Sequence, residues 1–180
     1  DDHSRYGSHV SPRLSALFKP GPWTLRASLG RGFYAPTPFV EEIEANGLSR
    51  LQPLQGLRAE TANTASVDLG YTHGPLEASL TLFGSNIDHA LQLRDIAADK
   101  VALVNADGLT RTRGAELLLR YRWQAVTFTG SYVHTDASEP DPDGPGRRAV
   151  PLTPRDTAGL TAVWEKPGHA RLGLEAYYTG

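Results

Sequence analysis

The stretch TRGAELLLRYRW at residues 112–123 decides the fold, because its side chains alternate in character from one residue to the next. In an extended strand, successive side chains point to opposite faces. One face is apolar or aromatic and consists of Ala115, Leu117, Leu119, Tyr121 and Trp123. The other is mostly polar and consists of Gly114, Glu116, Leu118, Arg120 and Arg122. After a turn at Gln124 the chain returns as AVTFTGSYVHT, so the pattern predicts a sheet between lipid and water.

The same alternation recurs along the chain in eight segments. They are residues 13–19, 23–33, 62–73, 76–87, 112–123, 125–135, 155–165 and 169–179. Strands of soluble proteins are usually about five or six residues long. A tilted strand that crosses a bilayer needs about 9–11 residues. The lengths of most of these segments therefore predict membrane-spanning strands.

The connections between the segments are alternately short and long. The short ones lie at residues 19–22, 73–75, 124 and 165–169. The long ones lie at residues 34–61, 88–111 and 136–154. Outer-membrane barrels have short periplasmic turns and long extracellular loops. The sequence thus predicts an all-β, antiparallel, up-and-down transmembrane barrel and also its orientation.

The aromatic residues agree with this orientation. Trp23, Trp123 and Trp164 all lie beside short turns, with Tyr71 at the same end, whereas Tyr132 and Tyr178 lie toward the other end. Aromatic side chains form girdles at both membrane interfaces of such barrels. The competing interpretation is that aromatic residues simply favour strands.

Composition sets further limits. The chain has 180 residues, a formal net charge of −2 and no cysteine, so it lacks a basic footprint for nucleic acid and any thiolate chemistry. The sequence contains no run of 18 apolar residues, so it predicts no membrane-spanning helix. The chain begins at Asp1 and contains no methionine, and we therefore expect it to be a segment of a longer protein.

Motifs of catalysis or metal binding are weak. No two of the six histidines are spaced as a metal-ligand pair, and Asp141–Gly144 is better interpreted as a solvated turn than as a calcium loop. No G-x-S-x-G elbow occurs, and Gly30-Arg31-Gly32 lacks the rest of a dinucleotide fingerprint. We predict no enzyme, no catalytic residue, no cofactor and no resident metal.

Several ordered motifs carry a resemblance to a known family. Pro12-Arg13-Leu14 leads through a short turn to a strand that ends GRGFYAP at residues 30–36. The next motif is L-x-x-E at Leu57 and Glu60, followed ten residues later by Gly70. Further motifs are Asn105 followed by Gly114-Ala115-Glu116, and Val150-Pro151-Leu152-Thr153-Pro154-Arg155. In this order and spacing they resemble the barrel of TonB-dependent outer-membrane receptors, with Ala59 and Arg155 as departures from frequent residues of the family.

The resemblance implies a 22-stranded barrel of which residues 1–180 are a partial domain of about eight strands. It also implies an active-transport receptor in the outer membrane of a Gram-negative bacterium. Such receptors take up a scarce ligand such as a ferric siderophore, haem or cobalamin, with energy from the TonB–ExbB–ExbD complex. We expect the plug, the TonB box through which that complex acts, and the last strand to lie outside this sequence.

Candidate ligand contacts are charged or aromatic residues of the lumen and the long loops. The charges expected to face the lumen are Arg26, Glu77, Glu116, Arg120, Arg122, Arg171 and Glu175. Placing such charges in lipid costs several kcal/mol near the midplane, so folding alone directs them inward. The residues predicted to bind the ligand are Arg31, Tyr34, Arg94, Arg111, Glu116 and Arg120.

Two other interpretations stay open from the sequence. The first is a passive porin or a small outer-membrane barrel, because eight strands can close into a small barrel. A soluble β-sandwich that binds a ligand is the other, although the strand lengths and the alternating connections argue against it.

Overall fold

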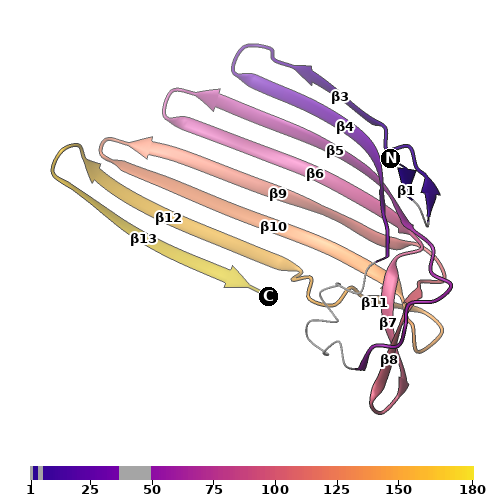
Figure 1. The fold of residues 1–180 in the computed structure, drawn as a ribbon. Helices are drawn as coiled ribbons and strands as arrows, with labels where there is room; N and C mark the ends of the chain where they lie inside the picture. Colours follow the sequence, from indigo (N-terminus) through magenta and orange to yellow (C-terminus); the bar gives the residue numbers. More distant parts are fainter. Residues whose placement is uncertain (1, 4–5, 37–49) are drawn as a thin grey trace.

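Eight long strands form one antiparallel sheet in the computed structural model, which describes residues 2–3, 6–36 and 50–180 (Figure 1). The order across the sheet is β3–β4–β5–β6–β9–β10–β12–β13. The bounds are Arg13–Phe18 (β3), Trp23–Tyr34 (β4), Glu60–His73 (β5), Leu76–Asp88 (β6), Thr110–Trp123 (β9), Val126–Pro140 (β10), Asp156–Lys166 (β12) and Ala170–Thr179 (β13). All eight predicted strands are therefore confirmed, with β10 reaching five residues beyond its predicted end.

The four short turns lie together at one end of the sheet, and the long connections lie at the other (Figure 1). Each short turn contains one residue with positive φ: Gly21 at 60°, Gly74 at 56°, Gln124 at 52° and Gly168 at 74°. Glycine adopts this conformation without a Cβ penalty, whereas Gln124 adopts it as a non-glycine residue. The predicted up-and-down order of the strands is confirmed.

The strand register places the predicted apolar residues on one face of the sheet. One cross-strand row runs through Phe18, Leu25, Leu69, Leu80, Leu117 and Tyr132. These side chains are exposed, as are Leu29 and Leu174 on the same face, at 59% and 79% of their full area. No second layer of the described chain covers them. In a transmembrane barrel, lipid covers such a face.

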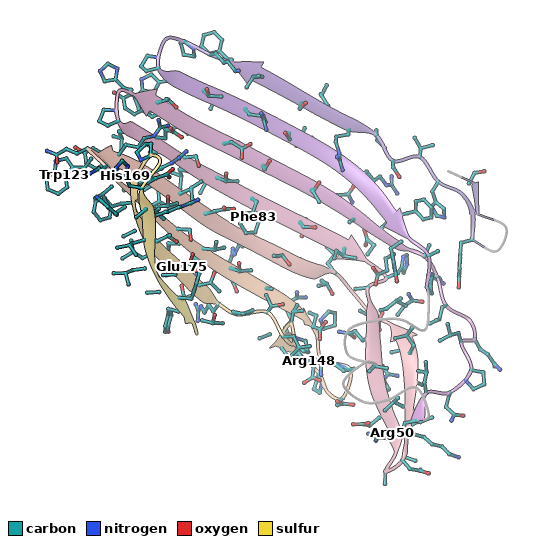
Figure 2. The ribbon with its side chains drawn as sticks, turned by 60° about the vertical axis from the view of Figure 1, so that its left-hand side comes forward. Arg50, Phe83, Trp123, Arg148, His169 and Glu175 are labelled. Carbon is teal, nitrogen blue, oxygen red and sulfur yellow. The ribbon has the colours of Figure 1, made fainter. Side chains whose placement is uncertain are left out.

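The tryptophans gather at the short-turn end. Trp23 begins β4, Trp123 ends β9, and Trp164 lies near the end of β12. The rings of Trp23 and Tyr71 on neighbouring strands are 4.6 Å apart, and Figure 2 shows Trp123 at the same end of the sheet. This arrangement is typical of an interfacial girdle.

Short strands outside the predicted segments lie in two of the long connections and before β3. β7 (Leu91–Ala97) and β8 (Lys100–Asn105) form a hairpin beyond the ends of β6 and β9. β11 (Arg147–Ala149) pairs with the end of β10, and β1 (Asp2–His3) pairs with β2 (Gly7–Ser8). Among the described residues, the buried apolar side chains belong to the hairpin and its flanks: Ala90, Val101, Leu103 and Ala106.

No helix in the described part of the chain is long and apolar enough to cross a membrane.

Candidate functional site

The charges predicted to face the lumen lie on the face opposite the apolar one. Arg26 and Glu116 belong to a row that also contains Asp68 and Thr81. The Thr81 hydroxyl donates a hydrogen bond of 2.8 Å to the Asp68 carboxylate. This face is therefore polar and hydrogen-bonded across strands, as a water-filled lumen requires.

Near the short-turn end, three lumen charges form a cluster. The Glu77 carboxylate lies 2.6 Å from an Arg122 guanidinium nitrogen and 3.8 Å from an Arg120 nitrogen. All three side chains are more than a third exposed, so the pairs add little stability. The cluster leaves one surplus positive charge on the lumen wall.

At the opposite end, residues 50–60 fasten the β7–β8 hairpin. The Asn105 side-chain oxygen accepts a 2.8 Å bond from the Arg58 main-chain nitrogen, and its amide nitrogen donates to the main-chain oxygens of Arg58 and His89 at 3.0 and 2.6 Å. The Gln52 main-chain nitrogen donates to the Val101 oxygen at 2.9 Å. Asn105, quoted above as a motif residue, thus joins two loop segments that are 47 positions apart.

Glu60, another motif residue, holds the start of the hairpin. Its carboxylate accepts a hydrogen bond from the Leu91 main-chain nitrogen at 2.5 Å. Partial burial raises the pKa of the Glu60 carboxyl, and the bond from Leu91 opposes part of this rise. Glu60 is the first residue of β5, at the end far from the short turns.

Two buried polar side chains hold the end of β10, one from the hairpin and one that reaches β11. Gln92 is 2% exposed, and its amide donates to the Pro140 main-chain oxygen at 2.8 Å. Glu139 is 5% exposed and accepts from the Arg148 guanidinium at 2.7 Å. Figure 2 shows Arg50 and Arg148 at this end of the molecule. The loop end is therefore a built structure with its own buried contacts.

The six residues predicted to bind a ligand are not brought together. Tyr34 ends β4 on the lumen side, whereas Arg31 and Arg111 belong to the register rows of the apolar face. Arg94 is exposed on β7, away from the main sheet. Glu116 lies midway along the lumen wall, and Arg120 belongs to the cluster near the short turns. They therefore occupy five regions of the molecule.

The histidine and aspartate motifs show ordinary structural contacts. The Asp141 carboxylate accepts a 3.0 Å bond from the Asp143 main-chain nitrogen, which is a local turn contact. His134 Nδ1 lies 2.8 Å from an Asp156 oxygen, a pair that the sequence analysis missed because it joins two strands. Among the described residues, no group of three or more His, Cys, Asp or Glu is placed to hold a metal ion.

A family model described as "TonB dependent receptor-like, beta-barrel" matches residues 1–180. A search of curated proteins found no match.

Solved structures share the fold. The siderophore receptor PirA from Pseudomonas aeruginosa is 19% identical, with a TM-score of 0.74 over 99% of this chain and 32% of that one. The hemophore receptor HasR from Serratia marcescens is 18% identical, with a TM-score of 0.73 over 94% of this chain and 32% of that one. The FrpB iron transporter from Neisseria meningitidis is 18% identical, with a TM-score of 0.68 over 94% of this chain and 26% of that one. The chain thus spans between a quarter and a third of the length of these proteins.

Proposed function

The chain belongs to the TonB-dependent receptor β-barrel family, whose members are outer-membrane transport proteins of Gram-negative bacteria and not enzymes, and we propose that it serves in uptake of a scarce ligand energised by TonB. The ligand class that we propose is a metal chelate such as a ferric siderophore, with haem and cobalamin as the other candidates. The observation that carries the proposal is the family match over residues 1–180.

The structural neighbours support the ligand class. They are a siderophore receptor, a hemophore receptor and an iron transporter. At identities below one fifth, these likenesses establish the fold alone, so the ligand comes to this chain only as a proposal.

The loop end is where we propose the ligand is first bound. Arg94 is exposed on the fastened β7–β8 hairpin, and Tyr34 lies at the loop end of the lumen wall. Glu116 and Arg120 lie deeper in the lumen, where a ligand passes after its release from the loops. We propose direct ligand contact for these four residues, with the guanidinium of Arg94 suited to an anionic chelate.

Energy coupling belongs to the whole receptor. We propose that the TonB–ExbB–ExbD complex acts through a plug domain that lies outside this sequence. Among the described residues, the other two sheets are two-stranded pairs and neither covers the main sheet, which disfavours a soluble β-sandwich. A passive porin is the remaining alternative and is tested directly below.

The test is uptake by cells that express the receptor carrying this chain, with and without a functional TonB. Radiolabelled ferric siderophores, haem and cobalamin are supplied separately at low concentration. We expect one of them to bind both strains and to accumulate only where TonB is functional. Equal accumulation in the two strains indicates a passive pore and overturns the proposal.

A pair of variants on one hairpin tests the ligand contact. Arg94→Gln removes the proposed anchor, and Lys100→Gln removes another exposed positive charge from the neighbouring strand. We expect the first to weaken binding about tenfold, as for loss of a charge-assisted hydrogen bond, and the second to leave it unchanged. Unchanged binding in both variants removes Arg94 from the proposal.

A further inference from the structure

Beyond the transport site, the apolar face of the sheet changes character near its loop end. One cross-strand row on this face contains Arg31, Asn63, Asn86, Arg111 and Ser138. Every member has a side chain that can hydrogen-bond, and none is a carboxylate. The next row toward the short turns contains Leu29, Ala65, Gly84, Arg113 and Asp136. The outward face therefore ends in a polar band above its apolar area.

The position of this band follows from strand geometry. Arg113 lies about ten residues along β9 from Trp123 at the short-turn girdle. At about 3.3 Å per residue and a tilt of about 35–45°, this places Arg113 about 23–27 Å above the girdle. The apolar band of a transmembrane barrel is about 25 Å tall. Arg113 and Arg111 therefore lie where the outer leaflet's headgroups begin.

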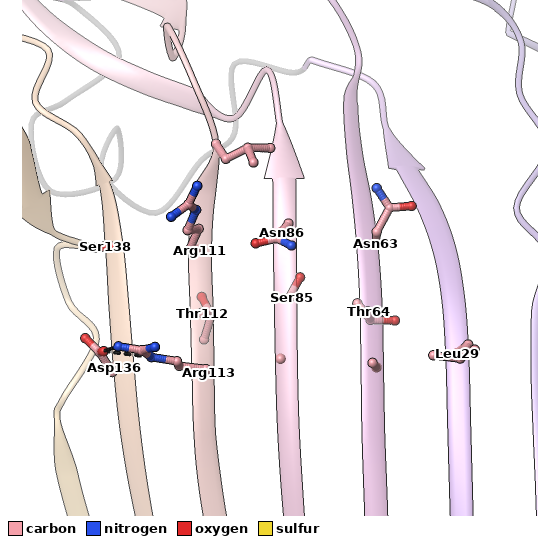
Figure 3. A pocket seen from close by; sticks show the side chains of 13 residues that line it. Leu29, Asn63, Thr64, Ser85, Asn86, Arg111, Thr112, Arg113, Asp136 and Ser138 are labelled. Atoms are coloured by element: carbon pink, nitrogen blue, oxygen red, sulfur yellow. Dashed lines mark hydrogen bonds and ion pairs between the residues drawn. The ribbon is translucent and has the colours of Figure 1, made fainter.

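Small residues make a hollow in this band. It has a volume of about 680 Å³ and crosses strands β4, β5, β6, β9 and β10 (Figure 3). Ala65 and Gly84 contribute almost no side chain to its lining, and Leu29 flanks it. All five strands have their neighbours on both sides, so the hollow lies well inside the sheet.

The charges in the hollow are mostly positive. Arg113 donates two hydrogen bonds, of 3.0 and 2.7 Å, to one oxygen of Asp136 (Figure 3). Asp136 carries the one carboxylate among the residues that line the hollow, so this carboxylate is already paired. Arg111 also lines the hollow, and its side chain has no hydrogen-bond or ion-pair partner among the described residues. Arg31 lies three strands away in the same row, outside the lining of this hollow, and its side chain also has no hydrogen-bond or ion-pair partner among the described residues. The polar row thus presents two unneutralised guanidinium groups, that of Arg111 in the hollow and that of Arg31 beyond it, with the amides of Asn63 and Asn86 between them.

We propose that this hollow and the polar row that crosses it bind the phosphate-bearing headgroup of an outer-leaflet glycolipid. Arg111 in the hollow and Arg31 beyond it in the row would contact the phosphates, and Asn63 and Asn86 between them would donate hydrogen bonds. Guanidinium groups match the geometry of phosphate oxygens. The acyl chains of the same lipid lie against the exposed apolar face below, which includes Val67 and Leu82. This lipid is distinct from the transported ligand, because the site lies on the outward face and not on the lumen wall.

The test uses the receptor carrying this chain, purified in mild detergent, stripped of lipid and offered purified bisphosphorylated lipid A. Native mass spectrometry counts the retained lipid and the number of protein copies. We expect the double variant Arg31→Gln/Arg111→Gln to retain lipid A with an affinity reduced about tenfold or more. The matched control is Lys19→Gln, which removes a positive charge at the short-turn end.

Further arms separate the alternatives. The unaltered receptor should bind dephosphorylated lipid A much more weakly, and millimolar inorganic phosphate should not displace lipid A, because the apolar face adds binding to the chains. Both of these measurements use the unaltered receptor, so they do not depend on whether the variants fold. Heat-modifiable electrophoretic mobility checks the folding of the variants. Equal retention by the double variant and the control overturns the proposal. So does a dimer that is lost in the double variant while its lipid binding is unchanged, because the face then binds a second copy.

Discussion

The Phe83 ring lies over Gly114 on the lumen face of the sheet, where the two residues are direct cross-strand neighbours of β6 and β9. A Cβ atom on Gly114 would lie 2.5 Å from Phe83 Cζ and would also collide with the His134 main-chain oxygen. Figure 2 shows Phe83 in the middle of the sheet, far from either rim. The glycine of the G-x-E motif is therefore required by the close approach of an aromatic ring and a main-chain oxygen.

Gly114→Ala should therefore destabilise the barrel by about 1–3 kcal/mol, as overpacking does elsewhere. The measurement is the temperature at which the folded receptor loses its heat-modifiable electrophoretic mobility. Gly130→Ala is the matched control, since it is also a strand glycine but its Cβ meets nothing within 4 Å. If the two variants unfold at the same temperature, the approach of Phe83 does not restrict residue 114.

The strands could be predicted because a membrane barrel repeats one local rule. Leu117 and Leu118 are adjacent and nearly equally exposed, at 46% and 41%. Their faces nevertheless follow from counting in twos from Trp123, because a one-residue step changes the face. The same rule assigned Arg120 and Glu116 to the lumen side, where the register places them.

The β7–β8 hairpin could not be predicted because its stabilising contacts are distant in sequence. Gln92 is buried through a bond to Pro140, which lies 48 positions away, and Leu91 is held by Glu60, 31 positions away. A polar residue buried inside a short strand reverses the usual local pattern. Arg31 and Arg111 are a different case, because counting in twos from Leu29 and Ala115 places them on the apolar face, where the register has them, although both are among the predicted ligand contacts.

Charge placed on the two faces should distinguish lipid from lumen. Leu117→Arg puts a cation near the middle of the apolar band and should cost about 2–4 kcal/mol, with a strong loss of folded receptor from the outer membrane. Leu118→Arg puts the same cation beside Ser79 and Ser131 and should be tolerated. The measurement is folded receptor per cell by heat-modifiable mobility. Equal loss in both variants would contradict the assignment of the faces.

Asn105 should hold the hairpin in place through its three hydrogen bonds. Asn105→Ala removes all three, and Asn105→Asp keeps an acceptor for the Arg58 nitrogen but loses the donors to Arg58 and His89. We expect amide hydrogen exchange over residues 89–106 to become faster in both, and more so in the alanine variant. Asp107→Ala, at an exposed neighbour, is the control. Exchange that does not change in Asn105→Ala would exclude this role.

The Glu60 carboxyl should make the attachment of the hairpin depend on pH. Its pKa in the folded loop is raised from the ordinary value of 4.5, so between 4.5 and the raised value the folded loop binds more protons than the open loop. Stability of the attachment should therefore be greatest at low pH and should fall as the pH rises through that window. Hydrogen exchange of the β7–β8 hairpin from about pH 4 to about pH 8, corrected for intrinsic rates, measures this fall.

Glu60→Gln separates the charge from the hydrogen bond, because the amide oxygen can still accept from the Leu91 nitrogen while the side chain no longer titrates. The variant should keep its protection across the whole pH range and should match the unaltered receptor at the acidic end. Glu116→Gln, on the lumen wall away from the hairpin, should leave the pH dependence as it was. If protection in the Glu60→Gln variant still falls with rising pH as it does in the unaltered receptor, another group controls the attachment. Desolvation of Glu60 would then have no measurable effect on the loop.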